Sequence, residues 1–198
     1  MKFLTKINKG AFLSIIVLIV LVIYLIIVSI NQTGDQPALK EACQNYIDLA
    51  QQYSLLPADY VDGTTLMTSS QQEQYMTDIK NALTPLFDSK NTAALNTTCN
   101  SFKKNLEPLF AGQVVVSSNQ ITITQYEDFT YSNDLVSVTF SYNKDSNVKT
   151  NVPQGGNSAN FGVQRNNTGV ITFKKVDNSF KIVSVNVFNN YVLNQRRG

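Results

Sequence analysis

The stretch LVSVTFSY, residues 135–142, decides how the second half of the chain is interpreted. Every second position holds a large apolar residue and the positions between them hold Ser or Thr. The apolar positions are Val136, Val138, Phe140 and Tyr142. A period of two predicts a β-strand with one face buried and the other in water, as in antiparallel sheets that are covered on one side.

Similar but shorter patterns lie on both sides of this strand. Before it, Val114 and Val116 predict one short strand, and Ile121 and Ile123 predict a second. After it, residues 170–176 and 180–193 predict a final hairpin that turns at Asp177-Asn178. The C-terminal half therefore predicts an antiparallel meander of about four to five strands.

Three interruptions break the alternation. Asn133-Asp134 predicts the turn before the strand at residues 135–142, and Glu127-Asp128 predicts a bulge or an exposed edge. Residues 145–169 are rich in Asn, Gly and Ser and predict a long loop. Such a loop is either an untethered hairpin tip or a partner-binding loop that carries Lys149 and Arg165.

The last predicted strand is apolar on both faces. Val183, Val185 and Val187 alternate along one face, and a second apolar set is expected on the opposite face. That second set is Phe180, Ile182 and Phe188. A strand that is apolar on both faces needs a cover on both sides, and the second cover is either the chain's own C-terminal turn or another subunit. Because exposed apolar patches often mark interfaces, these residues predict an interface that forms a weak homodimer.

Helical spacing replaces the period of two before Gly112. Apolar residues recur every three or four positions from Leu39 to Tyr53, which predicts a helix with Asp35 as N-cap and Pro37 in its first turn. A capping box at Ser70–Glu73 predicts a second helix that Pro85 kinks or ends near Leu83. A third is expected over residues 92–106. Three helices followed by a meander indicate an α+β fold with the helices on one face of the sheet.

The N-terminal run Ala11–Ile30 contains twenty residues and no charge. Twenty helical residues span about 30 Å, the thickness of the hydrocarbon core of a bilayer. Lysines precede the run and Asp35 is the first charge after it, so the N-terminus is expected in the cytoplasm and the domain outside. The predicted organisation is a cytoplasmic segment 1–10, a membrane helix 11–30, a linker 31–36, an extracytoplasmic domain 37–193 and a tail 194–198.

Two alternatives remain for this run. A cleaved signal peptide has a shorter apolar core and a small-x-small site, which Val28-Ser29-Ile30 does not supply. Lys9-Gly10 followed by Ala11 resembles a prepilin processing site. The pilin family usually carries Glu at the fifth position after the cut, and this chain has Ile15 there. A minor pilin-like subunit is therefore a second interpretation.

The two cysteines lie on predicted inner helical faces. Cys43 belongs to the first helix of the domain and Cys99 to the third. Because both would lie in an oxidising compartment, the sequence predicts a disulfide between them, with two buried thiols as the alternative. A catalytic thiol is disfavoured, since the chain has no His to activate one.

Composition excludes several classes of function. The chain has no His, two Cys, 15% charged residues and a net charge of +2. The commonest general base and zinc ligand is therefore absent, and no basic excess points to nucleic acid. We identify no catalytic, metal or cofactor-binding residues in the sequence. The expected partners are membrane lipid and other envelope proteins.

The order of elements resembles the cone-shaped fold of the nuclear transport factor 2-like and cystatin-like superfamily over residues 37–193. Bacterial members with one N-terminal membrane helix include the bitopic assembly proteins of type IV secretion and conjugation systems. The resemblance implies a scaffold without catalytic activity that dimerises and docks other envelope components. A small-ligand-binding or enzymatic cone domain is the alternative, because enzymes of the superfamily use a pocket carboxylate and tyrosine.

Overall fold

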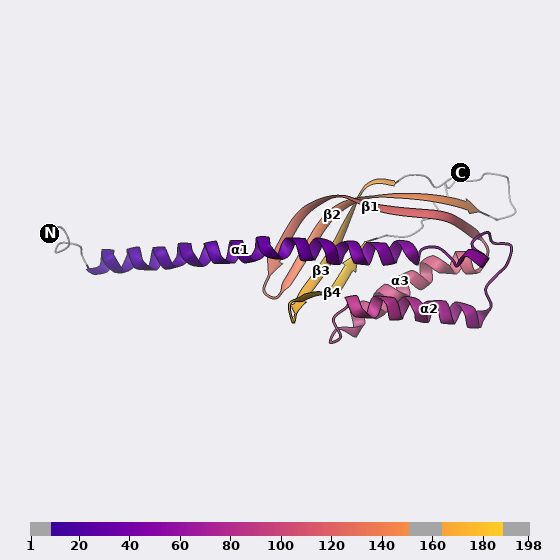
Figure 1. The fold of residues 1–198 in the computed structure, drawn as a ribbon, viewed down its shortest axis with the longest axis horizontal. Helices are drawn as coiled ribbons and strands as arrows, with labels where there is room; N and C mark the ends of the chain where they lie inside the picture. The colour runs from indigo at the N-terminus through magenta and orange to yellow at the C-terminus, as the bar shows by residue number, and fades with distance from the viewer. Residues whose placement is uncertain (1–8, 151–163, 188–198) are drawn as a thin grey trace, which may run out of the picture. The chain divides into compact units, whose positions relative to one another are not determined.

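The computed structural model of the chain describes residues 9–150 and 164–187 (Figure 1). It divides into two compact units, residues 1–37 and 38–198. The helical elements are α1 (Lys9–Gln52), η2 (Ala58–Tyr60), α2 (Ser69–Leu83), η3 (Thr84–Leu86) and α3 (Thr92–Phe110). The strands are β1 (Val114–Ser132), β2 (Leu135–Thr150), β3 (Gln164–Val176) and β4 (Ser179–Asn186).

Helix α1 is continuous where the sequence predicted a linker over residues 31–36. Asp35 is therefore not an N-cap, and Pro37 lies inside the helix. An interior proline removes one helical hydrogen bond, but the helical residues on both sides keep theirs, so the loss does not end the helix. The Thr33 hydroxyl donates to the Ser29 carbonyl at 2.9 Å, a side-chain bond within the same turns.

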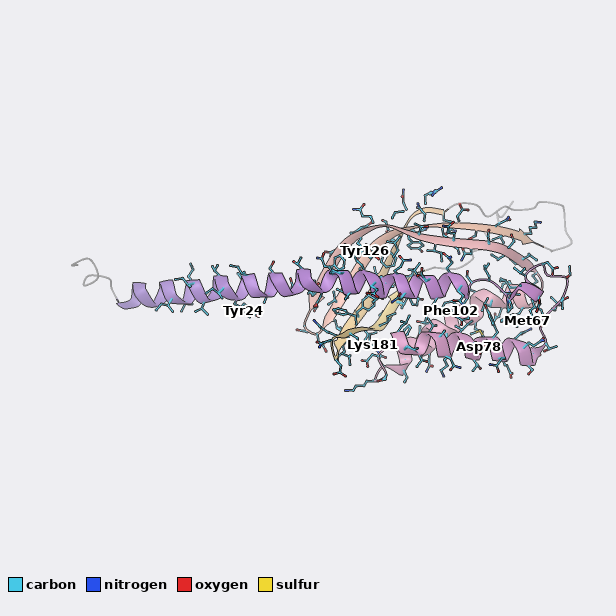
Figure 2. All side chains as sticks on the ribbon, viewed as in Figure 1. Tyr24, Met67, Asp78, Phe102, Tyr126 and Lys181 are labelled. Atoms are coloured by element: carbon cyan, nitrogen blue, oxygen red, sulfur yellow. The ribbon has the colours of Figure 1, made fainter. Side chains whose placement is uncertain are left out.

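The first unit exposes an unbroken run of large apolar side chains. Residues 16–26 are all Ile, Val, Leu or Tyr, and each is between 42% and 63% exposed. In Figure 2, side chains near Tyr24 extend from more than one side of the helix. Among the residues that the structure describes, none of the helices is sufficiently long and apolar for a membrane crossing.

The second unit confirms the predicted α+β class. Its sheet has four antiparallel strands in the order β1-β2-β3-β4. Buried residues of α1 from Leu39 onward pack with those of α3 and the sheet in one core, and α2 packs against α3 (Figure 1). The hairpin turns predicted at Asn133-Asp134 and Asp177-Asn178 are present, and Asn133, Asp177 and Asn178 adopt positive φ.

The strands are longer than the sequence predicted. The two short strands expected around Val116 and Ile121 form one strand, β1, which is an edge of the sheet. A register shift between Tyr126 and Asp128 confirms the bulge predicted at Glu127. The prediction of a loop over residues 145–169 is wrong at both ends of this range, because β2 continues to Thr150 and β3 begins at Gln164. The inner face of β2 continues through Val148, so burial extends the strand beyond the polar composition of the stretch.

The helices also differ from prediction at their ends. The capping box of α2 is formed by Thr68 and Gln71, two residues before the expected pair. Helix α2 ends at Leu83, as Pro85 predicted. Helix α3 continues past Leu106 to Phe110 because Leu109 and Phe110 are both buried in the core.

A bulge in β4 overturns the interface predicted on the last strand. Thr172 pairs with Ser184 and the next residue, Phe173, pairs with Ile182, so Val183 is an extra residue. The extra residue reverses the alternation, which places Ile182 and Val185 on the same face of the sheet. Ile182 is 1% exposed and belongs to the core.

The other two residues of that predicted interface have different outcomes. Phe180 is half-buried and packs edge-on against Phe173, with ring centroids 6.5 Å apart. Its face is therefore the core face and not a free surface. Phe188 lies outside the described residues.

We expect Ile182→Ala to lower the free energy of unfolding by about 2–5 kcal/mol, because it deletes buried methylene groups and leaves a cavity. Val183→Ala, at the half-exposed bulge position, is the matched control and should cost about 1 kcal/mol or less. Urea unfolding of the full chain, followed by circular dichroism, measures both. Equal losses for the two variants would show that Ile182 is not the core residue.

Candidate functional site: the inner pocket

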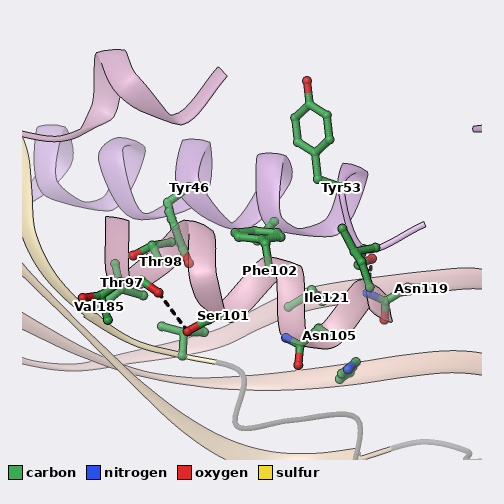
Figure 3. Close-up of a pocket in the computed structure, with 15 residues that line it drawn as sticks. Tyr46, Tyr53, Thr97, Thr98, Ser101, Phe102, Asn105, Asn119, Ile121 and Val185 are labelled. Carbon is green, nitrogen blue, oxygen red and sulfur yellow. Dashed lines mark hydrogen bonds between the residues drawn. The ribbon is translucent and has the colours of Figure 1, made fainter. Parts of the chain in front are cut away.

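A pocket opens between the helices and the sheet of the second unit (Figure 3). Its walls come from α1, α3, β1, β2 and β4. The volume of the pocket is about 80 Å³, which is enough for several water molecules or a small organic molecule. The described residues that line it are Tyr46, Ala50, Tyr53, Ser54, Thr97, Thr98, Ser101, Phe102, Asn105, Leu106, Asn119, Ile121, Lys144, Val185 and Val187.

The floor of the pocket contains polar residues that strand alternation places on the inner face. In β2 the buried positions continue past Tyr142 to Lys144, Ser146 and Val148. Lys144 is 9% exposed, and Ser146 is 8% exposed. Burial lowers the pKa of Lys144 to about 8, because the charged ammonium loses contact with water.

Hydrogen bonds between buried polar groups join α1 to the sheet beside the pocket. The Asn119 amide donates to the Ser54 hydroxyl at 2.5 Å, and the Ser146 hydroxyl donates to the Asn119 carbonyl oxygen at 2.6 Å. The Gln51 side-chain oxygen accepts from the Ile121 backbone N–H at 2.8 Å. Because both ends of the Asn119 amide are engaged, this network holds the floor in one arrangement.

Helix α3 supplies the rim and one wall. Thr97, Ser101 and Asn105 follow one another at four-residue spacing, so they lie along one face of the helix (Figure 3). Thr97 and Ser101 are exposed and Asn105 is half-buried, which places the opening of the pocket beside them. The Ser101 hydroxyl donates to the Thr97 carbonyl at 3.1 Å.

Tyr46 of α1 also lines the pocket. It is 2% exposed, and burial raises the pKa of its phenol, with the nearby Cys99 adding to the rise. The phenol therefore stays protonated at neutral pH and acts as a neutral hydrogen-bonding group.

The described lining combines polar and apolar side chains with one cation. Lys144 is the one charged residue among the described residues that line the pocket. The carboxylate and tyrosine pair of the superfamily's enzymes is therefore not assembled in this lining. No group of three or more potential metal ligands occurs in the described part of the chain.

Both cysteines are free thiols in the structure, so the predicted disulfide is not formed. Cys43 is buried, and burial raises the pKa of its thiol to about 12. Cys99 is half-buried and lines an outer groove between α2 and α3. Cys43 is therefore more deeply buried than Cys99, and both lie on the stripes that the sequence assigned to the interior.

Lys149 and Arg165, the residues of the predicted contact loop, are both exposed. They lie in β2 and β3, close to the ends of the strands that flank residues 151–163. The structure does not place either of them in the lining of the inner pocket.

Sequence reasoning missed the polar floor residues Lys144 and Asn119. The even-numbered alternation from Val136 resumes at Val148, and this continuation was the available signal for Lys144. Asn119 faces inward because Ser117 is an extra residue in β1, which shifts the alternation by one. A three-residue step between the apolar Val116 and the polar Asn119 gives no signal of a bulge.

Comparisons with known proteins do not identify a family or a fold for this chain. No protein-family model matches the chain, and no curated protein matches its sequence. A solved structure described as a periplasmic fragment of TraM aligns over 72% of this chain and 93% of that chain. The identity is 11% and the TM-score is 0.35. An alignment at this TM-score does not establish a shared fold.

We expect thiol-reactive maleimide to label Cys99 well before Cys43 in the folded protein. Burial raises the pKa of Cys43 to about 12 and that of Cys99 less far, so at pH 8 almost no Cys43 is present as the reactive thiolate. Cys43→Ser should keep the early labelling and Cys99→Ser should remove it, as followed by intact mass. In urea without reductant both thiols should react. A denatured chain with no reactive thiol would show instead that a disulfide forms.

Proposed function

We propose that this protein is a membrane-anchored binding or assembly module without catalytic activity, whose domain lies on the extracytoplasmic side of a bacterial cell membrane. Residues 11–30 are the anchor in this proposal. The domain docks other envelope proteins, and its copies share one membrane plane, which favours a homodimer through a raised effective concentration.

The observation that carries the proposal is the exposed apolar run of residues 16–26. A helix with apolar side chains exposed around its surface loses free energy in water, and lipid is the solvent that removes this cost. These residues lie within the longer uncharged run Ala11–Ile30. The length of that run matches the hydrocarbon core of a bilayer.

The orientation rests on the charges that flank the run. Lys2, Lys6 and Lys9 precede it, and the first charge that follows is Asp35. Positive residues stay on the cytoplasmic side during insertion, so the second unit would lie outside.

A role in assembly is supported by the surface of the second unit. The unit has its own apolar core, so it does not need a partner to bury its inner face. Lys149 and Arg165 are exposed on adjacent strands and offer two cations to an acidic partner. We propose them as contact residues.

The inner pocket supports the second candidate function, a small-ligand-binding domain. Its lining combines hydroxyl, amide and ammonium groups with apolar side chains, which is the usual composition of a ligand site. The two functions are compatible in one protein, because the pocket and the exposed cations involve different residues.

We expect Leu21→Arg combined with Leu25→Arg to release the protein from membranes. Each arginine at mid-membrane costs roughly 2.5–3.5 kcal/mol on insertion scales. Leu66→Arg, at an exposed leucine outside the run, is the control and should stay bound. The measurement is the fraction that resists carbonate extraction. Loss of the wild-type protein to the soluble fraction would end the anchor proposal, and an intact mass that starts at Ala11 would favour the pilin-like alternative.

We expect the double charge reversal Lys149→Glu and Arg165→Glu to remove crosslinks between this protein and its envelope partners. Reversal replaces attraction by repulsion at the contact, which lowers the association rate most at low salt. In-membrane photocrosslinking followed by mass spectrometry reads the partners. Lys103→Glu with Lys104→Glu, on α3, is the matched control. An unchanged crosslink pattern in the first variant would rule out these contacts.

A further inference from the structure

The outer groove between α2 and α3 shares none of its described lining residues with the inner pocket. Its volume is about 720 Å³, which falls within the range of about 300–1,000 Å³ that is usual for small-ligand sites. The two helices pack as antiparallel neighbours, because η3 and a short turn join the end of α2 to the start of α3 (Figure 1). At the other end of the groove, Tyr75 of α2 packs edge-on against Phe110 of α3, with ring centroids 6.4 Å apart.

The groove is acidic toward one end and basic toward the other. On α2, Glu73 lies nearer the Phe110 end and Lys80 lies nearer the turn that joins the helices. Helix α3 runs in the opposite direction and repeats this order with Glu107 and Lys103. These four charged side chains are exposed, and in the described part of the chain none of them forms an ion pair. The groove therefore offers a negative end and a positive end, and the four charges balance.

The distance between the two ends fits a molecule of about three amino-acid residues. Glu73 and Lys80 are two helical turns apart on α2, which corresponds to about 10.5 Å along the helix axis. An extended chain covers about 3.3–3.6 Å per residue, so a tripeptide separates its terminal ammonium from its terminal carboxylate by about 10 Å. Such a peptide can pair its ammonium with the acidic end and its carboxylate with the basic end. A single amino acid is too short to reach both ends.

Between these ends, the lining suits a peptide backbone. Asn100 of α3 exposes an amide that can donate to a peptide carbonyl and accept from a peptide N–H. The Thr77 hydroxyl donates to the Glu73 carbonyl at 2.9 Å, and its oxygen can still accept. Met76 and Cys99 are half-buried in the same lining and offer an apolar, adaptable contact. An extended peptide needs partners for its backbone groups, whereas a helix has already paired its own, so this polar lining favours an extended ligand.

We propose that the outer groove binds a short extended peptide of about three residues with both ends free. Its ammonium pairs with Glu73 and Glu107, and its carboxylate pairs with Lys80 and Lys103. Its central side chain lies against Met76. Short peptides with free ends are products of peptide-bond hydrolysis, so a reaction of that class has to supply the ligand. This binding activity goes beyond the assembly role and depends on neither that role nor the membrane anchor.

The test uses the full chain with isotope-labelled methionine methyl groups. Met76 lies in the groove, whereas Met67 is 7% exposed and is not part of the groove lining. The probe is the tripeptide Ala-Leu-Ala with free ends at pH 7. We expect it to shift the nuclear magnetic resonance signal of Met76 with saturation, at a Kd of roughly 0.1–1 mM for a ligand of this size, and to leave the Met67 signal in place. Bound peptide should also slow the maleimide labelling of Cys99.

Peptides blocked at one end test the two ends separately. Acetylation removes the charge of the ammonium and amidation removes the charge of the carboxylate. The double variant Glu73→Gln with Glu107→Gln should weaken binding of the free and the amidated peptide about fivefold and leave the affinity of the acetylated peptide unchanged. The double variant Lys80→Gln with Lys103→Gln should weaken binding of the free and the acetylated peptide by a similar factor and leave the amidated peptide unchanged. All four substitutions replace exposed side chains, so the variants are expected to fold.

Glu41→Gln on α1 and Lys104→Gln on α3 are the matched controls, because both residues are exposed and neither lines the groove. Both should bind every peptide as the wild type does. Equal affinities for Ala-Leu-Ala and its doubly blocked form would overturn the proposal, since the free ends would then not be recognised. Loss of the predicted pairing between blocked end and variant, or no shift of the Met76 signal up to about 10 mM peptide, would also overturn it. None of these results bears on the membrane anchor, which carbonate extraction tests separately.

Discussion

The rest of the domain depends on the unbroken alternation of β2. This strand pairs with β1 on one side and β3 on the other, and its inner residues form one row from Val136 to Val148. At each register shift in the described sheet, the extra residue belongs to β1, β3 or β4 and never to β2. The neighbouring strands therefore adjust to β2, because burial against the helices fixes which of its side chains point inward.

The adjustments determine what the inner face contains. Bulges in β1 turn Tyr126 and Phe129 toward the core, and the bulge in β4 does the same for Ile182 and Val185. Gly169 of β3 lies opposite Phe140, and a Cβ atom there would come within 2.7 Å of the ring. The glycine thus makes room for the fully buried ring of Phe140 in the β2 row. Bulges and one missing side chain let a regular strand and irregular neighbours share a single core.

The inner face of β2 changes from apolar to polar along the strand. The apolar end belongs to the core, and the polar end lies at the inner pocket. Apolar residues fill the face up to Tyr142, whereas Lys144 and Ser146 carry polar groups into the same row. The buried hydrogen bonds from Asn119 hold that end against α1. A pocket that forms where the core becomes polar can accept a ligand while the apolar part maintains the fold. The proposed anchor and contact residues lie outside this pocket.

The sequence alone determined the α+β class, the helix end at Leu83 before Pro85, the turns at Asn133 and Asp177, and the bulge at Glu127. These features depend on local chemistry, namely periodicity, proline and residues that tolerate positive φ. Only the tertiary structure decided the direction of Ile182, the inward position of Lys144 and the free thiol state of Cys43 and Cys99. One extra residue in a strand reverses every side chain after it, and pairing with the neighbouring strand, not the local sequence, selects where that residue is placed.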